Sequence, residues 1–435
     1  MLERLFHFSE LKTDWQTETV GGFTTFVTMA YIVVVNPTIL SDALGQNLFG
    51  ELLFATCVSA AVATLIMGLV ANYPFALAPG MGLNAFFAYS VVLGMGVRWD
   101  LALGVVLASG LLFTLLTFVR VREAMINAVP DALKHATAAG IGLFIAFIGL
   151  QWSGVIVGKP ETLVGLGDLR SAPVGLAMVG VLGIGVLLVR GYRGAILLGV
   201  IGVTLLAMLT GATPAPDGIF NMPTWPGHLF GVAVVNLPAA FDVGLIAVVF
   251  AFLFVDLFDT MGTLVGVSQR AGFLDADGRL PRANRALLAD SLGTVIGSVF
   301  GTSTVTTYIE SASGITAGAR TGFASVVTVL LLLLTLFVAP LVQAVPKFAV
   351  APALIVVGVL MMASAAEIKW RDASDALPAF LLMIAMPLTF SIANGVALGI
   401  VAYPIVKRLG GRGKDVHPLI DVLAVLFIAR YLFMD

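Results

Sequence analysis

Charged side chains are scarce in this chain of 435 residues: they make up 11% of it, while 59% of the residues are hydrophobic. Soluble domains carry about 25% charged residues, so the composition excludes a soluble globular protein. The formal net charge of −2 provides no basic surface, and we expect no nucleic-acid partner. At roughly 20 apolar residues per span, the chain is long enough for about 14 membrane spans.

Residues for metal and redox chemistry are also few. Cys57 is the only cysteine, which excludes an internal disulfide and a CxxC metal site. The histidines form no HExxH pair and are scattered at His7, His135, His228 and His417. No nucleophile–base pair marks a catalytic centre. We therefore expect no metal, no cofactor, no catalytic residue and no enzyme activity.

Apolar runs alternate along the chain with breaks rich in polar residues, proline and glycine, as in a polytopic membrane protein. We place spans at 21–40, 52–71, 75–95, 100–119, 134–152, 172–190, 194–211, 243–266, 286–300, 303–318, 321–340, 350–365, 376–392 and 394–409. An odd number of spans in each half makes the two halves enter the membrane from opposite sides. The predicted fold class is an all-α polytopic membrane protein with 14 transmembrane segments in a 7+7 inverted repeat.

The distribution of lysine and arginine predicts the orientation of the chain. With the N-terminus inside, the few basic residues of the external loops are Arg98, Lys159, Arg170 and Lys347. The long polar stretch 212–242 contains none, as expected of an external loop. We predict a multi-pass protein of the cell inner (plasma) membrane, embedded in the lipid bilayer, with both termini in the cytoplasm.

The third and the tenth span are interrupted. The run 73–89 contains Pro74, Pro79 and Gly80, which cannot all lie in a stable continuous helix. The run 300–314 starts with alternating Thr, Ser and Val, which favours extended chain. In each run we predict a short extended piece followed by a half-helix. Broken helices at matching positions of two inverted halves indicate a substrate site near the membrane midplane.

Apart from Asp100 at the first position of a span, the acidic residues within the predicted spans are Asp256, Asp259, Asp290 and Glu310, and the spans that contain these four have no lysine or arginine. An unpaired carboxylate costs about 2.5–3.5 kcal/mol in a span and is a functional-site candidate by default. Asp256 and Asp259 are i,i+3 neighbours, so we expect them on one helix face. Asp290 follows Arg285 closely, so a local ion pair or gate is as good a prediction as a proton role. The alternative for these carboxylates is a structural role, in which they only form hydrogen bonds with neighbouring helices.

Other candidates lie in the two half-helices. Glu310 opens the second one, where free N–H groups and the helix dipole are expected to steady its carboxylate. Asn84 in the first offers a donor and an acceptor to a ligand, with an interhelical hydrogen bond as the alternative. Phe86, Phe87 and Tyr308 could flank a flat ligand, although for the two phenylalanines ordinary apolar packing is favoured.

These motifs resemble the AzgA-like purine permeases of the nucleobase–cation symporter (nucleobase/ascorbate transporter) family, which includes uracil permeases. The resemblance covers nearly the whole chain. Its most specific parts are Ala78-Pro-Gly-Met-Gly-Leu-Asn-Ala85, Phe254-Val-Asp-Leu-Phe-Asp-Thr-Met-Gly262 and Thr306-Thr-Tyr-Ile-Glu310.

The resemblance implies a core domain that holds the substrate and a gate domain that often dimerises. The core domain would comprise 21–126 (spans 1–4) and 243–342 (spans 8–11), and the gate domain 127–211 (spans 5–7) and 343–410 (spans 12–14). The remaining segments would be a cytoplasmic N-terminal segment 1–20, an external linker 212–242 and an interfacial C-terminal tail 411–435. A homodimer through the gate domain is expected.

The expected function is import of purine nucleobases (adenine, guanine and/or hypoxanthine) by proton symport, through alternating access. Substrate-binding residues would be Asp259, Glu310, Asn84, Tyr308, Asp256, Gly82 and Thr307. Proton-coupling residues would be Asp259, Glu310, Asp256 and Asp290. The alternatives are another nucleobase (uracil, xanthine), a small anion, or sodium coupling through hydroxyl oxygens of 302–307. An anion carrier should avoid acidic side chains at its site, which argues against that alternative.

Overall fold

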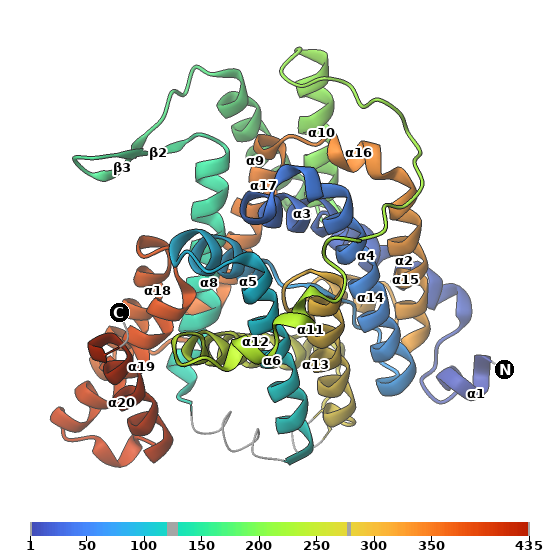
Figure 1. The fold of residues 1–435 in the computed structure, drawn as a ribbon. Coiled ribbons are helices and arrows are strands. Elements are labelled where there is room, and N and C mark those ends of the chain that lie inside the picture. Colours follow the sequence, from blue (N-terminus) through green and yellow to red (C-terminus); the bar gives the residue numbers. More distant parts are fainter. Residues whose placement is uncertain (1, 120–128, 276–279, 434–435) are drawn as a thin grey trace.

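The computed structural model describes residues 2–119, 129–275 and 280–433 (Figure 1). The predicted domain boundary at 126–127 lies outside the described residues. The elements of the first half are α1 (Leu2–Phe6), α2 (Trp15–Met29), α3 (Ile32–Leu44), α4 (Phe49–Ile66), β1 (Leu77–Pro79), α5 (Met81–Ala85), α6 (Trp99–Val119), α8 (Asp131–Trp152), β2 (Ile156–Lys159), β3 (Leu163–Leu166), α9 (Ala172–Val189) and α10 (Ala195–Leu209). A π-helical segment, Phe86–Gly94, continues α5.

The second half repeats this general order. Its elements are α11 (Val232–Asn236), α12 (Val243–Ala271), α13 (Ala283–Phe300), β4 (Val305–Thr307), α14 (Ser311–Thr316), α15 (Gly322–Thr335), α16 (Ala339–Gln343), α17 (Lys347–Met362), α18 (Ala373–Leu388), α19 (Ile392–Leu409) and α20 (Pro418–Phe433). The predicted linker 212–242 contains the short helix α11 near its end. This helix packs against α6 and α13.

Nine helices of the described chain are long and apolar enough to cross a membrane, and further apolar helices of 10–17 residues lie at 81–94, 195–209, 373–388 and 418–429. Two predicted spans are in neither set. The ninth corresponds to α13, whose buried polar residues include Asp290 and Thr294. The tenth corresponds to β4 and the six-residue α14. The count of fourteen spans thus stays a prediction.

Helix contacts divide most of the long helices into two groups. In one, α15 contacts α2 and α4, while α13 contacts α4 and α6; we call α2–α6 with α12–α15 the core group. In the other, α17 and α18 contact α8, α9 contacts α10 and α17, and α18 contacts α19; we call α8–α10 with α17–α19 the gate group. The groups meet where α12 contacts α8 and α19, and where α5 contacts α8.

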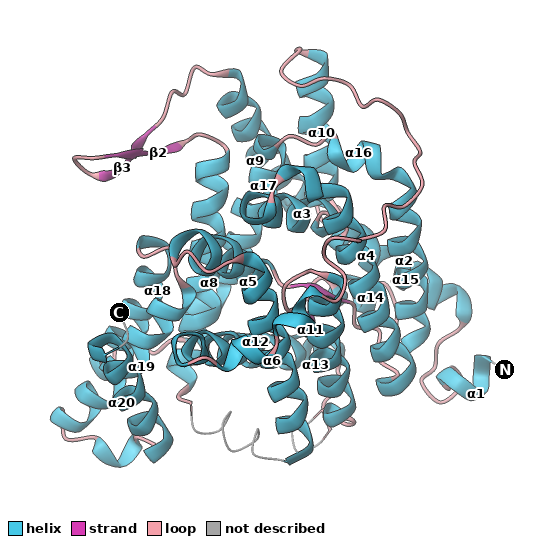
Figure 2. Ribbon diagram, viewed as in Figure 1, coloured by secondary structure: helices cyan, strands magenta, loops and turns pink. Residues whose placement is uncertain are grey.

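Two pairs of short strands interrupt the helical fold (Figure 2). The hairpin of β2 and β3 extends from the edge of the molecule, in a loop where the sequence predicts no strand. The strands β1 and β4 are separated by more than 220 residues, and both are fully buried. They form where extended pieces are predicted in the third and tenth spans.

Polar side chains mark the start of several helices. Asp14 accepts hydrogen bonds from the N–H groups of Gln16 and Thr17 at the start of α2, and Asp372 accepts one from the Ser374 N–H at the start of α18. Such caps are worth about 0.5–2 kcal/mol each. Hydrogen bonds from Ser374 lower the pKa of Asp372 to about 2, with a further contribution from Arg412.

Candidate functional site

The backbones of the two interrupted segments pair with each other in the interior. The strands are antiparallel, with Leu77 opposite Thr307 and Pro79 opposite Val305. Beyond the strands, the Gly80 N–H donates to the Thr304 carbonyl at 3.0 Å, and the Tyr308 N–H donates to the Ala76 carbonyl at 2.9 Å. Extended backbone at membrane depth requires such internal partners. The pairing therefore joins the starts of both half-helices.

One threonine hydroxyl holds the outer edge of each strand. The Thr64 hydroxyl on α4 accepts from the Leu77 N–H at 2.9 Å and donates to the Leu77 carbonyl at 3.0 Å. The Thr294 hydroxyl on α13 accepts from the Val305 N–H at 3.2 Å and lies 3.1 Å from the Val305 carbonyl. The same arrangement, a threonine hydroxyl that contacts both the N–H and the carbonyl of one strand residue, thus supports β1 and β4.

The carboxylates of Asp256 and Asp290 are fully buried and contact threonines of this framework. Oδ2 of Asp256 lies 3.1 Å from the Thr294 hydroxyl. Asp290 accepts from the Thr260 hydroxyl at 2.6 Å and from the N–H and hydroxyl of Thr307 at 2.9 and 3.0 Å. These bonds connect α12, α13 and β4. They use the N–H and hydroxyl of Thr307, so its contact with substrate stays a prediction.

The carboxylates of Asp259 and Glu310 are only half-buried. On α12, Oδ2 of Asp259 lies 3.7 Å from the position that a Cβ atom on Gly80 would occupy, so it faces the start of α5. Asp256, one turn earlier, contacts α13 instead. The two carboxylates, which the sequence predicts on one helix face, thus have different neighbours: α13 for Asp256 and the start of α5 for Asp259.

Glu310 directly precedes α14, and the buried Tyr31 donates a hydrogen bond to its Oε1. No N–H group of α14 caps the Glu310 side chain, which contradicts the expectation that the half-helix steadies this carboxylate. A tyrosine hydroxyl from the junction of α2 and α3 supplies the hydrogen bond instead. Sequence reasoning missed Tyr31, although a tyrosine far inside an apolar span departs from the usual position at the membrane interface.

Two fully buried asparagines lie beside the paired strands. Asn84 on α5 accepts from the Ser303 hydroxyl, while its Nδ2 has no hydrogen-bond partner in the described part of the chain. Nδ2 of Asn36 donates to Thr56 and Thr302 at 2.7 and 2.9 Å. An unsatisfied buried donor costs about 1–3 kcal/mol, so Nδ2 of Asn84 is a group that a ligand would satisfy.

Tyr308 and Gly82 hold neighbouring segments in place. The Tyr308 hydroxyl donates to the Pro79 carbonyl at 2.6 Å, which ties the second half-helix to β1. A Cβ atom on Gly82 would lie 2.5 Å from Cγ2 of Ile141, so glycine here lets α5 approach α8 of the gate group. Binding of substrate by these two residues stays a prediction.

A cavity of about 290 Å³ lies against α14. It is lined by Arg193, Ala271, Ala312, Ser313, Ile315 and Thr316. Arg193 comes from the connection between α9 and α10, and Ala271 ends α12. In the described residues, no group of three or more His, Cys, Asp or Glu side chains is placed to hold a metal ion.

Comparison with known proteins adds a family and a fold. Residues 16–398 match the model of a family described as a permease family. The chain is 47% identical to the guanine/hypoxanthine permease PbuG of Bacillus subtilis, over 100% of both proteins. It is 45% identical to the adenine permease AdeP of Escherichia coli, over 100% of this chain and 97% of that protein.

Among solved structures, the transmembrane domain of the cyanobacterial bicarbonate transporter BicA is similar, with a TM-score of 0.62. The match covers 87% of this chain and 97% of that chain at 16% sequence identity, so it shows the fold alone. The predicted helical membrane-transporter fold is confirmed.

Proposed function

We propose that this chain, which belongs to the permease family of nucleobase/ascorbate transporters, imports purine nucleobases by proton symport. Relatives that match along the whole chain are adenine and guanine/hypoxanthine permeases, which supports a purine substrate. The observation that carries the proposal is the division among the four carboxylates. Asp256 and Asp290 are buried in a threonine framework, whereas Asp259 and Glu310 stay partly exposed beside the two half-helices.

The polar groups of this region suit a purine. Purines present ring and exocyclic N–H donors next to ring-nitrogen acceptors. The carboxylates of Asp259 and Glu310 can accept from the donors, and Nδ2 of Asn84 can donate to a ring nitrogen. A site that leaves buried polar groups unpaired with the wrong base discriminates strongly. We therefore assign adenine, guanine or hypoxanthine as the substrate class.

Proton coupling is assigned to Glu310 and Asp259. Both carboxylates lie in the membrane interior, and within the described part of the chain neither forms an ion pair with a lysine or arginine. Tyr31 supplies a hydroxyl that can exchange a proton with Glu310. One proton moving inward gains about 2.3 kcal/mol per 100 mV, which is roughly fifty-fold in accumulation. Sodium coupling is less well supported, because the hydroxyls of Thr302, Ser303, Thr306 and Thr307 already bond protein groups. The Thr304 hydroxyl has no partner in the described chain, but one oxygen is too few for a sodium site.

We further propose that the core group moves against the gate group in the inner membrane, with both termini in the cytoplasm, and that the gate group forms a homodimer. Helix α9 offers a surface for the homodimer, because only 22% of its 18 residues are buried within the chain. The fold shared with a bicarbonate transporter does not favour an anion, since acidic residues line the region between the half-helices.

The test is uptake of radiolabelled adenine, guanine, hypoxanthine, xanthine and uracil into cells that lack their own nucleobase permeases. We expect uptake of one or more of the three purines, stimulated by external acid, retained in sodium-free medium and abolished by a protonophore. Transport that requires sodium would overturn the coupling and leave the substrate assignment intact. A preference for uracil or xanthine would overturn the substrate assignment.

A further inference from the structure

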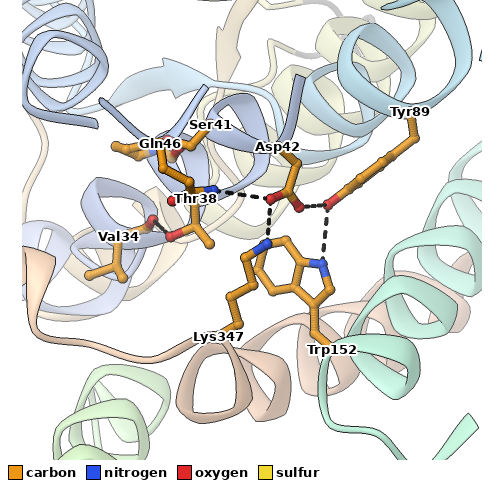
Figure 3. Close-up of polar contacts among 9 residues, drawn as sticks. Val34, Thr38, Ser41, Asp42, Gln46, Tyr89, Trp152 and Lys347 are labelled. Carbon is orange, nitrogen blue, oxygen red and sulfur yellow. Dashed lines mark hydrogen bonds and ion pairs between the residues drawn. The ribbon is translucent and has the colours of Figure 1, made fainter. Parts of the chain in front are cut away.

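A cluster of four polar residues, away from the proposed site, joins the core group to the gate group (Figure 3). Asp42 near the end of α3 forms an ion pair with Lys347 at the start of α17. The Tyr89 hydroxyl donates to Oδ2 of Asp42 at 2.9 Å, and the Trp152 indole N–H donates to the Tyr89 hydroxyl at 3.1 Å. The Lys347 ammonium also lies 5.5 Å from the centroid of the Trp152 ring. We call these residues the latch.

The latch connects segments that are distant in the chain and belong to different groups. Asp42 and Tyr89 come from α3 and the π-helical segment of the core group, whereas Trp152 and Lys347 come from α8 and α17 of the gate group. The Asp42 side chain is only 16% exposed and that of Lys347 43%. A half-buried ion pair with two further hydrogen bonds and an aromatic ring holds its partners better than an isolated surface pair.

The latch and the cavity lined by Arg193 lie at opposite ends of the gate group. Trp152 ends α8 just before the β2–β3 hairpin, and α9 starts after that hairpin. The 18 residues of α9 then lead away over roughly 27 Å to the connection that contains Arg193, which lines the cavity. The two groups are therefore bonded at the end predicted to be external. At the end predicted to be cytoplasmic, the cavity lies between Arg193 of the gate group and residues of α12 and α14 of the core group, while the adjacent Gly194 packs against Val27 of α2.

We propose that the latch is the external gate of the transport cycle, closed while the site is open to the cytoplasm and broken once in each cycle. The inference rests on the proposed movement of the core group against the gate group. A structural brace that never separates would look the same in one conformation, so the test must distinguish a contact that breaks from one that persists.

The first experiment locks the latch. In full-length protein with Cys57→Ala, which removes the only thiol, we introduce Asp42→Cys with Lys347→Cys and add a short bifunctional thiol reagent. Cross-linking is expected to reduce purine uptake by about tenfold or more, because a locked latch cannot open and the transport cycle then stops. The matched control is Asp42→Cys with Gln46→Cys, a pair within the core group whose side chains lie 3.4 Å apart. Its cross-linking should leave uptake unchanged.

The second experiment does not depend on uptake. A thiol introduced by Ser303→Cys, next to Asn84, is labelled from outside the cell with a membrane-impermeant maleimide, with and without Lys347→Met. Loss of the ion pair should speed labelling about two- to fivefold, the shift expected from one partly exposed ion pair. Arg98→Met is the control, since it breaks an ion pair with Asp100 within the core group.

Unchanged uptake after complete cross-linking of the 42–347 pair, or equal labelling rates with and without Lys347→Met, would overturn the external gate. Labelling that depends on Lys347 in a protein that transports no purine would contradict the proposed function and leave the gate in place.

Discussion

The two interrupted segments are supported in the same way and carry different functional groups. In the first, Thr64 holds Leu77, and the half-helix presents the amide of Asn84. In the second, Thr294 holds Val305, and the half-helix begins after the carboxylate of Glu310. The comparison shows that the two segments share their backbone supports, whereas the polar side chains of their half-helices differ. The predictions below test this division between support and chemistry.

Glu310→Gln should have the largest effect. The amide keeps the size of the side chain but cannot carry a proton or accept with a negative charge, so we expect accumulation of purine to fall by about a hundredfold. Uptake is measured at equal amounts of protein in the membrane, with the exposed Glu367→Gln as the control. Wild-type accumulation in Glu310→Gln would remove this residue from the coupling mechanism.

Asn84→Ala should alter recognition rather than coupling. It removes the buried Nδ2 that has no partner in the described chain, and we expect the KM for the preferred purine to rise about tenfold and selectivity among bases to relax. Competition assays with the nucleobase panel measure both, and Asn221→Ala on the exposed linker is the control. An unchanged KM and substrate profile would assign Asn84 to packing.

Tyr31→Phe tests the residue that replaces the expected helix cap at Glu310. Loss of one hydroxyl donor to a carboxylate should reduce uptake about three- to tenfold, and the dependence of uptake on external pH should change. Tyr192→Phe, at an exposed position after α9, is the matched control. A pH profile identical to wild type would show that Tyr31 has no part in proton coupling.

Thr64→Val and Thr294→Val compare the two supports directly. Each change keeps the shape of the side chain and leaves one strand N–H and one carbonyl without their threonine, so each should cost about 1–3 kcal/mol of stability. Melting temperatures in detergent should fall in both variants, because the bonds to Leu77 and Val305 match. The fall should be larger for Thr294→Val, because the Thr294 hydroxyl also contacts the Asp256 carboxylate. A clear loss in only one variant would contradict a shared support.

The sequence predicted where the helices are interrupted, but not how the interrupted segments pair with each other. Pro74, Pro79 and Gly80 cannot continue a helix, so the extended piece that became β1 followed from local chemistry. The pairing of β1 with β4 could not be predicted, because three-residue strands carry almost no register information and their partners lie far apart in the chain. The β2–β3 hairpin joins strands that are adjacent in the chain, and it was missed because strands of four residues carry little pattern.

The site shows the same limit. The carboxylates were found because a charge in an apolar span is conspicuous, but i,i+3 spacing could not separate Asp256 from Asp259. Their difference depends on which helix covers each side chain, and that is a property of tertiary packing. Tyr31 and Asn36 are polar residues inside an apolar run, but the run does not show what they bind; that follows only once Glu310 and Thr302 are placed beside them.

Proton movement in proteoliposomes tests the central claim most directly. Purified protein is reconstituted in vesicles that contain a pH-sensitive dye, in sodium-free buffer, and adenine, guanine or hypoxanthine is added outside under an inside-negative potassium diffusion potential. The account predicts acidification of the vesicle interior that requires a purine and is absent in Glu310→Gln. Purine uptake without any acidification, or equal acidification by the Glu310→Gln protein, would contradict it.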